Sequence, residues 1–394
     1  MLLVMIVLAL AVSIALAGSA GGITDPGTPD PDPIDGTDEA DDLQGTGGDD
    51  VMRGLSGDDT IQGFGGDDTI DGGGGDDYIR GGEGDDLVMG GPGNDHLRDR
   101  DAGGDDTMRG GAGDDRFDID SPGGTTHAYG GQGDDSFSWT AGQATLIGGD
   151  GDDSFSAAFD HETGALYGGR IDGGEGIDSL YLPHFLSDRT YSLILDPDGS
   201  VLQTDTGPAV SVTGIERVHL GIGDVLVDGT AMTDDLYIEG DQEFFYEDYQ
   251  STLLGGSGDD TLTGGSVMEG GDGDDVLIAS QIGSTMTGGE GADTFVYDDY
   301  DTYQWDVDHH WYYSAPTVIT DFDPAEDHLE LTVRYPEVIH WGPDTEPVAP
   351  PEITIVDDPE NNQTIIQVNG NAAMVLQGVT DFDPSLLALT ITPY

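Results

Sequence analysis

The sequence predicts an all-β protein: a right-handed parallel β-roll of nonapeptide repeats in two blocks, with a small β insert and a C-terminal β cap. Three observations predict it. From Gly45 a nine-residue unit recurs six times without a slip, and its eighth position is always apolar. The chain also holds 65 Gly and 80 Asp or Glu in 394 residues. An apolar residue between polar neighbours is typical of a short strand with one side facing inward.

The N-terminus carries an apolar segment and then a linker. Leu2 to Ala17 is apolar apart from Ser13, which is short for a membrane span and typical of the core of an export signal. We therefore predict a signal peptide or N-terminal anchor over 1–20, with membrane contact only through this segment if it stays uncleaved. Residues 21–44 are rich in Pro and Asp and are predicted to be an extended acidic linker.

The repeats occupy 45–181 and 255–296. In a clean unit such as 81–89 the first six positions are predicted to form a Gly-rich turn, since Gly tolerates positive φ. The sixth position is Asp in every strong unit. These aspartates are the candidate metal ligands: Asp50, Asp59, Asp68, Asp77, Asp86, Asp95, Asp106, Asp115, Asp135, Asp153, Asp178, Asp260, Asp275 and Asp293.

The aspartates need a counterion. Two nonapeptides make one coil of a roll, and stacked coils lie about 4.8 Å apart, which places each aspartate over the one eighteen residues away. Two bare carboxylates at that spacing repel by about 1–3 kcal/mol. Ca²⁺ fits because it takes six to eight carboxylate and carbonyl oxygens. Mg²⁺ demands a small octahedral site, and zinc or copper would require the His or Cys that the units lack.

The unit G-G-x-G-x-D-x-U-x resembles the nonapeptide of RTX (repeats-in-toxin, haemolysin-type) calcium-binding proteins. The resemblance covers about 45–181 and 255–296. It implies a parallel β-roll in which Asp carboxylates and turn carbonyls hold a row of calcium ions.

The remaining segments are predicted to be β-rich. Residues 182–254 break the repeat and are predicted to form a small β insert. In 297–394, Val368-Asn369-Gly370-Asn371 is typical of a tight hairpin turn. This region resembles the C-terminal segment of secreted RTX proteins, which caps the roll and carries the type I secretion signal. Because type I substrates usually lack an N-terminal signal, both type I and general secretory export machinery stay open as partners.

Composition excludes several functions. The chain has ten basic side chains and a formal net charge of −70, so nucleic acid would be repelled. It has no Lys for a P-loop and no Cys for disulfides or thiolate chemistry. His161-Glu162 is not followed by a second His at metalloprotease spacing, and no G-x-S-x-G motif occurs. The chain is therefore not expected to be an enzyme.

The resulting hypothesis is an exported, extracellular protein whose calcium sites are empty inside the cell and filled outside it. Two alternatives stay open. One is a surface or biofilm adhesin that binds cell-surface glycans through an acidic aromatic patch containing Trp305 and Trp311. The other is a secreted hydrolase or epimerase with a site in 182–254 or 297–350.

Overall fold

The computed structural model describes residues 33–100, 103–157, 167–182, 190–197, 199–204, 208–221, 224–240, 251–279, 283–299, 315–335, 338–341, 344–347 and 350–393. The predicted export segment 1–20, Trp305 and Trp311 lie outside these residues. Within the described ranges the secondary structure is β-strand, apart from one short 3₁₀ turn, Pro384–Leu386. None of the described helical residues forms a segment long and apolar enough to cross a bilayer.

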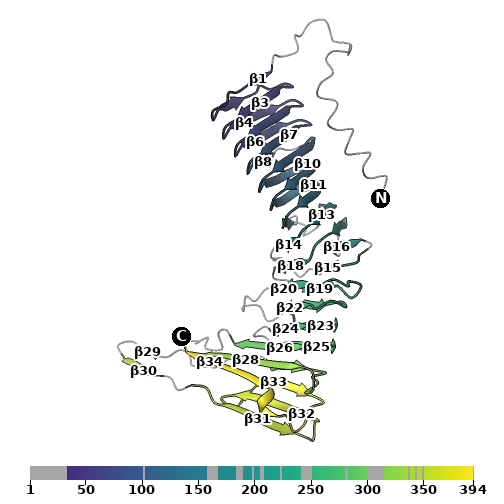
Figure 1. Cartoon of the computed structure of the whole chain (residues 1–394), viewed down its shortest axis with the longest axis vertical. Coiled ribbons are helices and arrows are strands. Elements are labelled where there is room, and N and C mark those ends of the chain that lie inside the picture. The colour runs from purple at the N-terminus through teal and green to yellow at the C-terminus, as the bar shows by residue number, and fades with distance from the viewer. Residues whose placement is uncertain are drawn as a thin grey trace. The chain divides into compact units, whose positions relative to one another are not determined.

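The first stack of strands covers the first repeat block (Figure 1). Its strands are β1 (Ile34–Asp35), β2 (Asp42–Gln44), β3 (Val51–Ser56), β4 (Thr60–Gly65), β5 (Thr69–Gly74), β6 (Tyr78–Glu83), β7 (Leu87–Pro92), β8 (His96–Asp99), β9 (Asp105–Ala112), β10 (Arg116–Gln132), β11 (Ser136–Asp150), β12 (Ser154–Ala157), β13 (Gly169–Glu175) and β14 (Ser179–Leu182).

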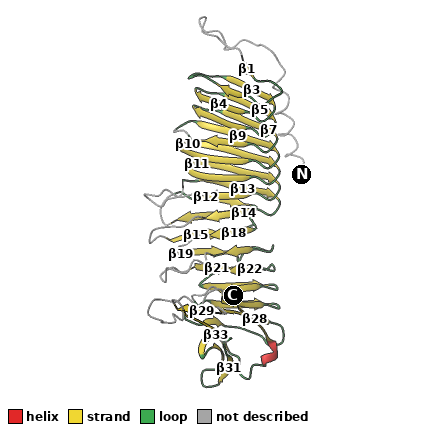
Figure 2. Cartoon of the chain, turned by 90° about the vertical axis from the view of Figure 1, so that its left-hand side faces the viewer, coloured by secondary structure: helices red, strands yellow, loops and turns green. Residues whose placement is uncertain are grey.

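Two parallel ladders alternate along the chain. One runs β3–β5–β7–β9 and the other runs β4–β6–β8, because each strand pairs with the strand two places further on. Met52 lies opposite Ile70, and Ile61 opposite Ile79, which is the eighteen-residue coil of two nonapeptides. Figure 2 shows the strands stacked one above another. The predicted parallel β-roll is confirmed.

The position-eight side chains form the core between the two ladders. In the strong units they are at most 2% exposed, and Phe117, Phe137 and Phe155 stack with ring centroids 4.5 and 4.8 Å apart. Burying one such side chain contributes about 1.5–3 kcal/mol. The space between the two ladders is therefore filled by one continuous column of apolar side chains.

The strands are longer than the sequence pattern predicts. Strand β4 starts at position seven of one unit and ends at Gly65, which is position three of the next. Its two inward residues are Ile61 and Gly63, so the turn covers only positions four to six. A Cβ on Gly63 would lie 2.2 Å from the Asp68 Oδ2 atom and 2.4 Å from the Gly81 carbonyl oxygen. Glycine is required there because the aspartate and the next coil occupy that space.

The roll also begins earlier than the linker boundary that we predicted at residue 44. Strand β1 pairs with β3, and β2 pairs with β4, both in parallel. Residues 36–44 carry Asp41 at position six and Leu43 at position eight, but Glu39 replaces the usual glycine at position four. The proline-rich composition before this unit concealed it.

The segment 182–254 continues both ladders. Strands β18 and β20 carry one ladder from β14 to β22 in parallel pairing. The other ladder passes through antiparallel pairs β17–β16 and β16–β15 before it resumes in parallel at β19 and β21. The strands are β15 (Thr190–Ile194), β16 (Ser200–Thr204), β17 (Val210–Thr213), β18 (Arg217–Leu220), β19 (Asp224–Asp228), β20 (Tyr237–Glu239), β21 (Ser251–Leu254) and β22 (Thr261–Thr263).

The C-terminal part ends both ladders. Strand β34 extends the ladder through β28, and β33 extends the other through β27, while β31, β32 and β33 form an antiparallel meander. The predicted hairpin is confirmed: Asn369 and Gly370 both have positive φ between β32 and β33. The strands are β23 (Val267–Asp272), β24 (Val276–Ala279), β25 (Thr285–Glu290), β26 (Thr294–Asp299), β27 (Thr317–Ile319), β28 (His328–Tyr335), β29 (Val338–Trp341), β30 (Asp344–Pro347), β31 (Ile353–Asp358), β32 (Gln363–Val368), β33 (Asn371–Gln377) and β34 (Leu387–Pro393).

Leu55 and Phe64 sit at position two with φ of 84° and 78°, a conformation that costs an L-residue about 1–2 kcal/mol. Both side chains are exposed. Glycine would remove this strain, partly offset by about 0.5–1 kcal/mol of backbone entropy. We expect Leu55→Gly or Phe64→Gly to raise the free energy of unfolding in calcium by about 0.5–1 kcal/mol, measured by urea denaturation. Val51→Gly, at an exposed position without positive φ, should lower it; equal effects at all three positions would contradict the strain argument.

Candidate metal centre

All fourteen predicted aspartates are at most 4% exposed; thirteen of them lie between strands, and Asp106 lies near the start of β9. They form three rows along the stack. The longer row of the first block holds Asp59, Asp77, Asp95, Asp115, Asp135, Asp153 and Asp178; the shorter one holds Asp50, Asp68, Asp86 and Asp106; the third holds Asp260, Asp275 and Asp293.

Within a row, the backbone amide of each aspartate donates a hydrogen bond to the side chain of the next aspartate. The Asp59 amide donates to the Asp77 Oδ1 atom at 2.8 Å, and the Asp115 amide donates to the Asp135 Oδ1 atom at 2.7 Å. The same bond recurs from coil to coil, across 18 residues in regular coils and across 15, 20 or 25 residues where the length of the coil differs. One carboxylate oxygen of each pair therefore ties two coils together.

The second oxygen has no such partner. Most of the Oδ2 atoms are buried without a hydrogen bond, namely those of Asp59, Asp68, Asp77, Asp95, Asp106, Asp115, Asp135, Asp153, Asp178 and Asp275. A buried carboxylate oxygen without a partner is costly, by about 1–3 kcal/mol or more for a charged group. This cost recurs along each row, so an additional positive partner would stabilise the whole stack.

The pKa values of the aspartates also indicate that the rows need a bound cation. Burial raises the pKa of Asp86 and Asp115 to about 7, and that of Asp106 to about 8, although hydrogen bonds from backbone amides act in the opposite direction. Neighbouring carboxylates raise these pKa values further; for Asp106 the buried Asp99 contributes. Without a cation, the folded roll would hold protons on these side chains near neutral pH.

The donor set fits calcium. The rows offer unpaired carboxylate oxygens, and successive turns approach so closely that a Cβ on Gly113 would lie 2.1 Å from the carbonyl oxygen of Gly93. Carboxylate and carbonyl oxygens are the ligands that Ca²⁺ prefers. Among the described residues, no three His, Cys, Asp or Glu side chains converge on one metal position, so turn carbonyls would have to complete each site.

Three residues that the sequence analysis missed extend these rows at their ends. The Asp41 amide donates to Asp59, the Asp178 amide donates to Glu216 Oε2 at 2.9 Å, and the Asp293 amide donates to Asp327 Oδ1 at 3.1 Å. Asp41 was detectable from the apolar Leu43 two residues later. Glu216 and Asp327 were not, because 38 and 34 residues separate them from their partners.

A second series of hydrogen bonds from backbone amides to side-chain oxygens lies at position five, where most strong units also carry Asp. Its direction is reversed: the Asp67 amide donates to Asp49 Oδ1 at 2.9 Å, toward the preceding coil. These side chains are exposed. Asn94 fills the same role and accepts from the Asp114 amide at 2.9 Å, so position five requires an acceptor but no charge. The doublet Asp-Asp was visible in the sequence, and the structure separates the roles of its two members.

The predicted aromatic patch lies largely outside the described residues. Tyr297, which precedes the two tryptophans in this patch, is described; it lies within β26 and is 8% exposed. It packs with the hydrophobic core.

Comparison with known proteins defines the class of these repeats. A family model described as RTX calcium-binding nonapeptide repeat (4 copies) matches residues 35–63, 62–97, 101–118, 248–266 and 269–299. The chain therefore carries RTX calcium-binding nonapeptide repeats, and its resemblance to RTX proteins is confirmed. Such repeats typically form non-catalytic regions of secreted, extracellular proteins.

No curated protein matches the chain. Among solved structures, the crystal structure of the extracellular lipase LipA from Serratia marcescens is similar, with 14% identity and a TM-score of 0.18. The match covers 75% of this chain and 40% of that chain. The chain thus spans about two fifths of the length of the lipase.

Asp115→Asn tests position six. The variant keeps an acceptor for the Asp95 amide but removes the charge of an orphaned buried oxygen. Because calcium affinity follows the number of charged ligands, we expect the calcium concentration at the folding midpoint to rise about tenfold, measured by circular dichroism. The matched control is Asp114→Asn at position five, which should leave the midpoint within about twofold. Equal shifts in the two variants would contradict the assignment.

Proposed function

We propose that this is an exported calcium-binding RTX protein without catalytic activity, whose β-roll folds when it binds extracellular calcium. The proposed calcium ligands are the fourteen position-six aspartates together with turn carbonyls. The single observation that carries the proposal is the run of buried Oδ2 atoms without a hydrogen-bond partner along the rows.

The difference in calcium concentration between the cytosol and the outside of the cell is expected to trigger folding. Sites with dissociation constants of about 10⁻⁴–10⁻³ M, typical of extracellular modules, are empty in the cytosol and filled outside the cell. An ion that binds only the folded chain adds its binding free energy to stability. The chain would then cross the membrane as an unfolded polyanion, through type I or general secretory machinery, and fold outside.

We also propose a division of the chain into domains. It comprises an export segment or anchor at 1–20, an acidic linker, a first roll block from β1 to residue 181, an insert at 182–254, a second roll block at 255–296 and a cap at 297–394. The two ladders that run through 190–254 favour one continuous folding unit in which calcium bound to either block stabilises both.

Equilibrium dialysis of the full chain against calcium tests the proposal. We expect several calcium ions per chain, bound with a steep dependence on concentration because filling one site orders the coil next to it. Magnesium at the same concentration should not compete. Binding of one ion or none, or equal binding of magnesium, would refute the proposal.

A further inference from the structure

Positive charge gathers on one outward face of the first stack. Of the ten basic side chains, Arg80, Arg98 and Arg116 lie on β6, β8 and β10, and Arg100 follows β8 directly. The strand register aligns Arg80 with Arg98, and His96 with Arg116. On a chain with a net charge of −70, this cluster is a local reversal of sign.

One buried carboxylate organises the cluster. Asp118 accepts from Arg116 Nη2 at 3.0 Å, lies 3.0 Å from His96 Nε2, and pairs with Arg98 and Arg100 at 3.6 and 3.4 Å. Burial would raise the pKa of Asp118, but the hydrogen bonds from His96 and Arg116 outweigh it and hold that pKa below its usual value. A single negative charge therefore faces three guanidinium groups, and positive charge is left in excess.

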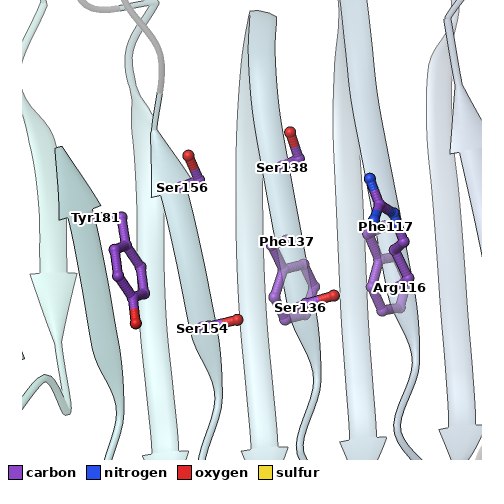
Figure 3. Close-up of a pocket in the computed structure, with 8 residues that line it drawn as sticks. All are labelled: Arg116, Phe117, Ser136, Phe137, Ser138, Ser154, Ser156 and Tyr181. Carbon is purple, nitrogen blue, oxygen red and sulfur yellow. The ribbon is translucent and has the colours of Figure 1, made fainter. Parts of the chain in front are cut away.

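A hollow of about 160 Å³ opens beside this cluster. Its floor is made of serines on adjacent strands: Ser136 and Ser138 on β11, and Ser154 and Ser156 on β12. Figure 3 shows the serines in neighbouring positions, with Arg116 on one side and Tyr181 on the other. The hollow exists because short side chains in four positions are flanked by two long ones.

The walls differ in chemistry. The Arg116 side chain is 60% exposed and bonds Asp118 through Nε and one N–H of Nη2, which leaves Nη1 and the second N–H of Nη2 to form paired hydrogen bonds with a ligand. The Tyr181 ring is stacked on His219, with ring centroids 4.4 Å apart, and this contact holds it upright. The site thus offers a guanidinium, several hydroxyl groups and one aromatic ring.

We propose that this hollow binds one ring of an anionic saccharide, with the ring over the serine hydroxyls and its carboxylate or phosphate on Arg116. A guanidinium recognises planar anionic groups through paired hydrogen bonds, and hydroxyls match the donors and acceptors of a sugar. The volume is below the roughly 300–1,000 Å³ of pockets for drug-sized ligands, which suits a single ring. A protein partner is disfavoured because serine, which forms the floor of the hollow, is depleted at protein interfaces.

The proposal is separate from calcium binding, because none of the residues that line the hollow is a position-six aspartate. It requires only that the roll be folded.

Isothermal titration calorimetry of the full chain, at one fixed free calcium concentration, tests the ligand class. The probes are hexameric galacturonic acid, its methyl ester, and glucose 6-phosphate with glucose as its neutral counterpart. We expect each anionic probe to bind at least tenfold more tightly than its neutral counterpart. The stronger of the two anionic probes identifies carboxylate or phosphate as the recognised group. Equal affinity of charged and neutral probes, or binding of none, would overturn the proposal.

Three variants locate the site. Arg116→Ser removes the guanidinium, and Ser156→Trp fills the hollow without changing charge; both should weaken binding at least tenfold. Arg170→Ser is the matched control, since Arg170 also pairs with an aspartate, Asp172, but lies on β13. It should change affinity less than twofold, and circular dichroism in calcium should be the same for all variants. If Arg116→Ser and Arg170→Ser weaken saccharide binding equally, or if Ser156→Trp leaves it unchanged, the assignment is wrong.

Discussion

Chelation of calcium is expected to unfold the roll at neutral pH. At about 100 times the dissociation constant, each bound ion adds about 2.7 kcal/mol to stability, and the rows offer many sites. A folded domain is typically stable by only 5–15 kcal/mol in total, so removal of several ions exceeds that margin. EGTA should therefore abolish the β signal in circular dichroism and enlarge the hydrodynamic radius.

The control is the return of both signals when calcium is added in excess of EGTA, and their absence when magnesium is added instead. A chelated chain that keeps its β signal and its radius would show that the core residues suffice to hold the coils together.

Acid is expected to replace calcium in part. Burial raises the pKa of Asp77 to about 6, that of Asp153 to about 7 and that of Asp106 to about 8, above the ordinary value of 3.8. A carboxyl whose pKa is raised on folding contributes stability that is fully present below the unfolded pKa and is lost as pH rises through the folded pKa. The calcium-free chain should therefore be more folded at pH 5 than at pH 8.

Calcium affinity is expected to change with pH in the opposite direction from the stability of the calcium-free chain. Protons and calcium compete for the same oxygens, so the affinity for calcium should fall as pH drops from about 8 to 6. Circular dichroism of the chelated chain between pH 5 and 8, and calcium titrations at both limits, measure the two effects. Asp106→Asn removes the carboxyl with the highest of these pKa values and the destabilisation that its ionisation causes, so it should shift the acid-folding midpoint of the chelated chain to higher pH. A chelated chain that is less folded at pH 5 would contradict the assignment of buried, mutually repelling carboxylates.

Much of the site could be predicted from the nonapeptide period. The period places an apolar residue such as Ile61 inward and an aspartate such as Asp59 in every turn, and the eighteen-residue coil follows from two units. It could not reveal that Gly63 is a second inward residue, because this depends on the space that Asp68 and the next coil take up.

The repeat, its register, the column of buried apolar side chains and the position-six aspartates all follow from the amino-acid sequence, because each is a local pattern of residue types at a fixed spacing. Tertiary structure decided where the rows end, at Glu216 and Asp327, and how the arginines meet the serine hollow. Those contacts join outward or irregular positions whose spacing changes with every insertion, so their neighbours exist only once the coils are stacked.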